Sequence, residues 1–240
     1  MLKAIFFDMD ETLCGTSVAD EQASQKFSDW IKQTYPHIVD EQRFSKRYLA
    51  GVYKQLNHEF PQLAALLPDE AHFRCELIRT LLAEQGIHVD EPAARVALAY
   101  FDNERMAAFT FFSGVAELLV SLRKRYTLVV ITNGPRFSQY PKLAAVNMAD
   151  WVDHIIVGGD EPAEKPAASI FQKALDLAGV PPEQALHIGD SLACDIAGAN
   201  AMGITSVWVD ASGKGKLSDV LPNHRVRQVT ELPEILAKLH

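Results

Sequence analysis

Two carboxylates near the start of the chain, Asp8 and Asp10, follow directly on the apolar run 4–7. Carboxylates are rarely left unpaired at the edge of a protein core. Two of them, one residue apart at the end of a buried strand, could supply an oxygen nucleophile and a proton carrier, and they would require a cation nearby. We therefore expect a reaction site where this strand ends.

The second half of the chain contains the elements that would position such a site. Short apolar runs, each followed by Gly, Asn or Asp, alternate with segments of helical spacing. Continuous apolar runs of this kind are typical of strands buried on both faces. The expected strands are 127–131, 154–157, 185–188 and 205–209, and the expected helices are 115–124, 139–147, 169–178 and 193–201. The alternation predicts an α/β fold with a doubly wound parallel sheet.

Residues 15–111 carry a different pattern, with amphipathic helical stripes and no convincing strand. For example, Phe27, Trp30 and Ile31 share one helical face. This segment is predicted to be an all-helical inserted domain. The α/β core would then be discontinuous in sequence, formed by 1–14 and 112–240.

Polar residues occur where the predicted strands end, and in an open α/β sheet ligands bind beyond the carboxyl ends of the strands. These residues are Asp8, Asp10, Thr132, Asn133 and Asp190, with Asp195 one turn further on. Several carboxylates in one crevice repel each other unless a cation neutralises them. Oxygen ligands favour a hard ion, and Mg²⁺ suits a partly hydrated site that a substrate phosphate completes.

Donors for a phosphoryl group follow two other strands. Lys165, in the segment 164–166, could pair with both a carboxylate and a transferring phosphoryl group. Thr132 and the backbone around Asn133 and Gly134 could supply neutral donors. Because Gly134 has no side chain, the backbone there can approach a ligand closely.

These segments together resemble the four motifs of the haloacid dehalogenase (HAD) superfamily of aspartyl phosphotransferases. In this chain the motifs are Asp8-Met-Asp10-Glu-Thr12, Thr132 in Ile-Thr-Asn-Gly, Lys165 in Glu-Lys-Pro, and Gly189-Asp190-Ser191-Leu-Ala-Cys-Asp195. One Asp-x-Asp is a weak signal, whereas four motifs in the family's order are a strong one. The resemblance implies a Rossmann-like core, with the insertion 15–111 as a helical cap of the C1 type that closes over the site and contributes specificity.

The resemblance also implies catalytic roles. Asp8 is the nucleophile and forms an aspartyl-phosphate. Asp10 protonates the leaving group and then activates the water that hydrolyses the intermediate. Thr132 and Lys165 hold the phosphoryl oxygens. The implied reaction is hydrolysis of a small phosphorylated metabolite, either a sugar phosphate or a nucleotide.

Metal ligation is implied for the first and fourth motifs. Asp190 binds Mg²⁺ together with a carboxylate oxygen of Asp8 and the backbone carbonyl of Asp10. Asp195 orients Lys165 or a metal-bound water. The ion offsets the repulsion between an anionic phosphate and an anionic nucleophile.

Two stretches of the second half resemble one branch of the superfamily more closely, the N-acylneuraminate-9-phosphatases. They are 157–171 and 132–142, the second of which contains Arg136, Gln139 and Lys142. The Asp-Glu-Thr-Leu sequence of the first motif is instead typical of nucleotidase-like relatives. Arg136 is a candidate for contacting an anionic substrate, and a solvated loop arginine is an equally good interpretation.

Composition limits the partners of the chain. A net charge of -8 argues against broad nucleic-acid binding and against docking on anionic membranes. No apolar run approaches the roughly 18 residues of a membrane span. The three scattered cysteines indicate neither a disulfide framework nor a zinc site, and they fit a reducing compartment. We expect a cytoplasmic monomer or homodimer that binds neither nucleic acid nor a membrane.

Other functions stay open at this point. A dehalogenase of the superfamily also uses an aspartate nucleophile, but it lacks the second carboxylate and needs no Mg²⁺, so Asp10 argues against it. A phosphomutase would isomerise its substrate with a phosphorylated activator, and a phosphonatase would form a Schiff base on a cap lysine. A non-catalytic binding module would be expected to carry degraded motifs, and none of the four is visibly degraded.

Overall fold

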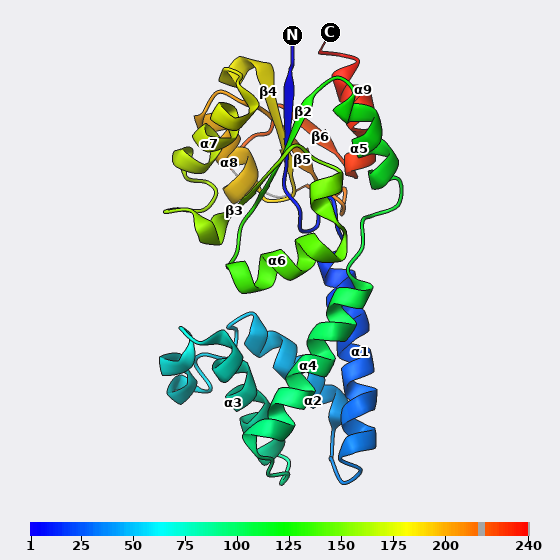
Figure 1. The fold of residues 1–240 in the computed structure, drawn as a ribbon, viewed down its shortest axis with the longest axis vertical. Helices are drawn as coiled ribbons and strands as arrows, with labels where there is room; N and C mark the ends of the chain where they lie inside the picture. Colours follow the sequence, from blue (N-terminus) through cyan, green and yellow to red (C-terminus); the bar gives the residue numbers. More distant parts are fainter. Residues whose placement is uncertain (216–218, 240) are drawn as a thin grey trace. The chain divides into compact units, whose positions relative to one another are not determined.

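A six-stranded sheet organises the larger part of the computed structural model, which describes residues 1–215 and 219–239 (Figure 1). The strand order is β3-β2-β1-β4-β5-β6, and every neighbouring pair in this order is parallel. The strands are β1 Ala4–Phe7, β2 Thr127–Thr132, β3 His154–Val157, β4 Ala185–Gly189, β5 Thr205–Val209 and β6 His224–Val226. The predicted α/β fold with a parallel sheet is therefore confirmed.

The chain forms two compact units. One consists of Met1–Thr16 together with Phe109–His240, and the other of Ser17–Ala108. The second unit starts two residues later and ends three residues earlier than the predicted insertion 15–111. The first unit contains the whole sheet and all four sequence motifs.

Helices cover both faces of the sheet in the first unit. They are α5 Val115–Arg123, α6 Arg136–Ala145, α7 Ala168–Ala178, α8 Ala197–Ala201 and α9 Leu232–Leu236. Figure 1 shows α7 and α8 on one side of the sheet and α5 and α9 on the other. On the α7 side, Phe171 packs in a buried apolar cluster with Phe6 of β1 and Ile131 of β2. This two-sided coverage explains why the strands are continuous apolar runs.

Strand β1 is the element that positions the first motif. Phe7, its last residue, pairs with Val130 of β2 on one side and with Ile188 of β4 on the other. All four residues of β1 are fully buried. The carboxyl end of β1 is therefore fixed between the carboxyl ends of the two strands that carry the second and fourth motifs.

Two parts of the first unit differ from the sequence prediction. The segment expected as one helix, 193–201, is a π-helical turn, Leu192–Ile196, followed by the short α8. The wide turn arises because the N–H of Ile196 donates to the carbonyl of Ser191, five residues earlier. Strand β6 was not predicted, because three residues that include an exposed Arg225 form no apolar run.

The second unit is helical, and no strand occurs among residues 17–108, all of which the structure describes. Its helices are α1 Thr16–Thr34, which begins in the first unit, α2 Glu41–Val52, α3 Glu70–Ala83 and α4 Glu91–Ala108, with a 3₁₀ turn at Pro61–Leu66. An aromatic core surrounds Phe27, whose ring centroid lies 5.2 Å from that of Tyr48 and 5.4 Å from that of Phe101.

Across the described ranges, no helix has both the length and the apolar composition needed to cross a lipid bilayer.

Candidate active site

Asp8 is the first residue beyond β1, and it is buried. Its backbone N–H donates a 2.9 Å hydrogen bond to the carbonyl of Ile188, which extends the pairing with β4 past the end of the strand. Since β1 lies between β2 and β4, residues that follow those strands flank Asp8 on either side. The sheet thus brings the motif segments together at the carboxyl ends of its central strands.

Lys165 connects two carboxylates at these strand ends. Its Nζ lies 2.6 Å from Oδ1 of Asp8 and 2.7 Å from Oδ1 of Asp195, and its side chain is 1% exposed. The backbone of Lys165 is held by Asn133, whose side-chain amide donates to its carbonyl at 2.8 Å and accepts from its N–H at 2.9 Å. The Asn133 side chain therefore positions Lys165, and the substrate contact predicted around Asn133 is one of its backbone.

Burial and charge together set the ionisation of this group. Burial raises the pKa of Asp8 to about 8, although the Lys165 ammonium opposes the shift. Burial would also raise the pKa of Asp195, but Lys165 and His187 outweigh it and hold that pKa well below its usual range. Burial lowers the pKa of Lys165, but its two carboxylate partners more than offset this, so that the pKa lies above its usual value. The ammonium therefore lies between one firmly ionised carboxylate and one that readily takes up a proton.

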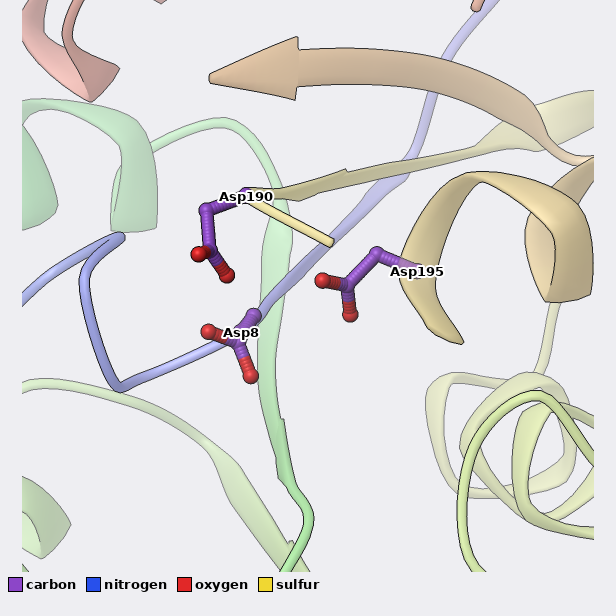
Figure 2. A group of neighbouring side chains, drawn as sticks. All are labelled: Asp8, Asp190 and Asp195. Carbon is purple, nitrogen blue, oxygen red and sulfur yellow. The ribbon is translucent and has the colours of Figure 1, made fainter. Parts of the chain in front are cut away.

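Three carboxylates form a group that could hold a cation. Asp8, Asp190 and Asp195 each offer an oxygen, and these atoms all lie within 4.8 Å of one another (Figure 2). The pKa of Asp190 is raised to about 6, first by burial and then by the charge of Asp195. A bound cation relieves such repulsion, and an all-oxygen donor set suits a hard divalent ion. The residues present therefore fit a cation such as Mg²⁺.

Asp195 has both of its oxygens engaged by protein donors. Its Oδ1 faces Lys165 and also lies 3.0 Å from Nε2 of His187, while its Oδ2 accepts the N–H of Ser191 at 3.0 Å. The carboxylate packs directly over Gly189, where a Cβ atom would lie 2.3 Å from Cγ of Asp195. The position of Asp195 is thus determined by its surroundings before any ligand arrives.

The Asp10 carboxylate has a different set of partners. Nζ of Lys142 lies 2.9 Å from Oδ1 and 3.0 Å from Oδ2 of Asp10, Oγ1 of Thr16 donates to Oδ1 at 2.5 Å, and Nε2 of Gln139 donates to Oδ2 at 3.3 Å. The sequence predicts Asp10 among the metal ligands together with Asp8, Asp190 and Asp195. The predicted contact is that of the Asp10 backbone carbonyl, so its side chain is not needed in the three-carboxylate group and stays available for proton transfer.

The segment after β2 is shaped around Gln139. The hydroxyl of Thr132, which is buried, donates to Oε1 of Gln139 at 3.0 Å. Gly134 has a φ of +111°, and a Cβ atom there would lie 2.7 Å from Nε2 of Gln139. The N–H of Gly134 donates to Glu164 at 2.9 Å. In the structure, the group that approaches the Gly134 backbone closely is the Gln139 side chain.

Arg136 lies at the start of α6 and is largely exposed, with a side-chain exposure of 69%. Its Nη1 is 3.0 Å from Oδ1 of Asp160, and its guanidinium lies over the ring of Tyr140 at 5.5 Å. The structure thus pairs this predicted substrate contact with an acidic side chain of the protein itself.

Four side chains contact the motif carboxylates although the sequence analysis assigned them no role: Thr16, Gln139, Lys142 and His187. Gln139 and Lys142 are three residues apart, a spacing that places them on one side of a helix. His187 interrupts an otherwise apolar buried strand, and burial lowers its pKa. The sequence could have indicated a role for His187, because it is a polar residue within an apolar run.

The model of the haloacid dehalogenase-like hydrolase family matches residues 2–203 of this chain. The chain therefore belongs to that family, and it is a hydrolase.

Relatives with named activities match over almost the whole length. The rat (Rattus norvegicus) N-acylneuraminate-9-phosphatase is 28% identical over 240 residues, covering 99% of this chain and 95% of the relative. The glyceraldehyde 3-phosphate phosphatase of Pyrococcus furiosus is 28% identical over 242 residues, covering 99% and 93%. Among solved structures, a 2-haloacid dehalogenase from Pseudomonas syringae superposes with a TM-score of 0.70 at 27% identity, with 100% of both chains covered.

Proposed function

We propose that this hydrolase is a Mg²⁺-dependent phosphatase that cleaves a small phosphorylated metabolite through an aspartyl-phosphate on Asp8. The observation that carries the proposal is the buried Lys165 ammonium, 2.6 Å from Asp8 on the side of the site where Asp190 and Asp195 also converge. An anionic substrate and an anionic nucleophile repel each other, and cationic groups at the point of contact reduce that repulsion.

The proposed reaction has two chemical steps. In the first, a carboxylate oxygen of Asp8 bonds to phosphorus, the bond from phosphorus to the leaving oxygen breaks, and Asp10 gives its proton to that oxygen. In the second, Asp10 takes a proton from a water molecule as the water attacks phosphorus, which releases phosphate and restores the Asp8 carboxylate. Lys165 and Thr132 bind the phosphoryl oxygens, and the Thr132 hydroxyl turns from Gln139 to the substrate.

A divalent ion would be held by carboxylate oxygens of Asp8 and Asp190 and by the backbone carbonyl of Asp10. When bound, it supplies charge neutralisation for the incoming phosphate. Asp195 belongs to the same carboxylate group, and its negative charge would add to the attraction for the ion. Asn133 acts by positioning Lys165, and Arg136 is free to bind substrate only if it leaves Asp160.

The names of the relatives support a class of substrate. Their names give an acidic sugar phosphate, a triose phosphate and, in Thermus thermophilus, phosphoserine. These compounds share a phosphate ester of an aliphatic alcohol, a leaving group that needs a proton donor such as Asp10. We propose an aliphatic phosphate ester as the substrate and the helical unit, Ser17–Ala108, as the cap domain that selects it.

A panel of phosphate esters tests the proposal. The purified protein is incubated with Mg²⁺ and N-acylneuraminate 9-phosphate, glyceraldehyde 3-phosphate, phosphoserine or nucleoside monophosphates, and released phosphate is measured. We expect release from at least one ester and none with the variant Asp8→Asn. A panel without any phosphate release, or full activity in that variant, would overturn the proposal.

The likeness to a 2-haloacid dehalogenase makes dehalogenation the second candidate. Halide release from a 2-haloacid, measured with a chelator present, tests it. The pairing of Asp10 with the buried Lys142 favours the phosphatase, because a haloacid releases halide without a proton donor, whereas an alkyl phosphate ester needs one.

A further inference from the structure

We propose that Lys142 and Gln139 are positioning residues that hold the Asp10 carboxylate for proton transfer to the leaving group. The inference rests on the proposed phosphatase function. It assigns a task to two α6 residues that contact Asp10.

The Lys142 ammonium is placed to orient Asp10 as a whole. Its Nζ is nearly equidistant from the two carboxylate oxygens, at 2.9 Å and 3.0 Å. Because the ammonium is a point charge that contacts both oxygens, it holds the carboxylate in place, while Thr16 and Gln139, each bound to one oxygen, set its plane. The Lys142 side chain is only 4% exposed, whereas that of Asp10 is 27% exposed, so the ammonium is withdrawn from solvent and the carboxylate stays partly exposed.

The surroundings of Lys142 show that it is not a solvated surface lysine. Its Nζ lies 5.7 Å from the centroid of the Phe109 ring, so that one side of the ammonium faces an aromatic surface. Burying an ammonium is costly unless a carboxylate accompanies it, and here Asp10 is that carboxylate. The pair keeps a full positive charge beside the residue that becomes anionic when it gives up its proton.

Gln139 connects Asp10 to the end of β2. Its Nε2 donates to Asp10, so its Oε1 faces the opposite way and accepts the hydroxyl of Thr132. The reverse orientation of the amide would place its oxygen against the Asp10 carboxylate, which is repulsive. Gly134 leaves the space that Nε2 of Gln139 occupies. The loop after Thr132 thus leaves room for Gln139, which connects Thr132 of the second motif to Asp10 of the first motif.

Lys142 and Gln139 are expected to act in the first chemical step, in which Asp10 gives its proton to the leaving oxygen. As the bond from phosphorus to the leaving oxygen breaks, the proton moves from Asp10 to that oxygen, and Asp10 is left as an anion beside Lys142. Loss of Lys142 should therefore slow the step when the leaving group needs the proton. It should matter little when the leaving group departs as a stable anion.

The test compares two substrates in one enzyme. We would measure kcat/KM of the wild type and Lys142→Met for an alkyl phosphate that the wild type hydrolyses, and for p-nitrophenyl phosphate, whose leaving group needs no proton. We expect kcat/KM to fall about 10²-fold on the alkyl ester and much less on the aryl ester, because general acid catalysis is worth about 10²–10⁴-fold. Lys142→Arg should recover part of the loss.

Two further variants separate positioning from folding. Asp10→Asn should show the same preference for the aryl ester, and adding Lys142→Met to it should cause little further loss, since the two residues act through one proton. Gln139→Leu, which removes no charge, should shift the preference in the same direction by a smaller factor. The matched surface control is Lys173→Met, which breaks the exposed pair with Glu161 and should leave both rates unchanged.

Three results would overturn the positioning role. They are an equal fall of kcat/KM on both esters, a change in KM alone, and additive losses of kcat/KM in the double variant. A wild-type protein that cleaves neither ester would instead overturn the proposed phosphatase function, so the two failures are distinguishable.

Discussion

Gly189 lies directly beneath the Asp195 carboxylate, so that a Cβ atom at position 189 would be 2.3 Å from Cγ of Asp195. Asp195 has no room to retreat, because it is buried and its oxygens accept from Lys165, His187 and Ser191. The absence of a side chain at Gly189 therefore allows the Asp195 carboxylate to pack against the backbone of the fourth motif.

Gly189→Ala should therefore displace Asp195 and, with it, Lys165. We expect a stability loss of about 1–3 kcal/mol, which is typical of overpacking a buried site, and at least a tenfold loss of kcat. Chemical denaturation and phosphate release measure the two effects. A variant at 189 with wild-type kcat would contradict the packing role.

His187→Phe should destabilise the protein by about 1–3 kcal/mol, because it leaves Asp195 short of one buried hydrogen bond. The aromatic ring of the replacement keeps the edge contact with Phe171, whose ring centroid is 5.2 Å away. Denaturant unfolding of both proteins at neutral pH checks the difference. Equal unfolding free energies would show that the His187 contact is dispensable.

The same variant should change how stability depends on pH. Burial lowers the pKa of His187 in the folded state, so below the usual histidine pKa of about 6.5 the unfolded chain binds a proton that the folded chain does not. This contribution to stability is present above pH 6.5 and is lost as the pH falls toward the folded-state pKa. We expect His187→Phe to lose less stability than the wild type between pH 7 and pH 5.

Mg²⁺ should stabilise the protein more strongly as the pH rises from 6 to 8.5. Cations bind ionised carboxylates, and burial raises the pKa of Asp8 to about 8 and that of Asp190 to about 6, so protons compete with the metal in this interval. Thermal unfolding with and without Mg²⁺ measures the difference, and Asp190→Asn should reduce it at every pH. A Mg²⁺ effect that is independent of pH, or unchanged in Asp190→Asn, would argue against the three-carboxylate site.

The main architecture could be predicted from the sequence, because the buried strands are largely apolar runs and each motif follows one. The strand end at Phe7 and the helical character of 17–108 follow from periodicity alone. Strand β6 could not be predicted in this way, since its pairing with β5 depends on tertiary contact and not on apolar residues of its own. The π-helical turn at Leu192–Ile196 was missed for a similar reason, because it depends on a backbone hydrogen bond that leaves no mark on periodicity.

Within the site, the sequence indicates which residues carry charge but not how the charges are paired. Lys142 and Gln139 are polar residues on a helix, and a solvated helix face would have the same pattern. Only the folded structure shows that Lys142 is buried against Asp10. Likewise, only the folded structure shows that the Asn133 side chain makes two hydrogen bonds with the Lys165 backbone.

The central claim is that Asp8 carries the phosphoryl group during turnover, and chemical trapping tests it most directly. An acyl phosphate is reduced by borohydride, so rapid denaturation of the working enzyme followed by reduction and peptide mass spectrometry identifies the modified residue. We predict that the Asp8 side chain is converted to the alcohol in the wild type, only when a hydrolysable phosphate ester is present. Modification of another residue, or turnover of the same ester with Asp8 unmodified under conditions in which phosphoenzyme accumulates, would contradict the account.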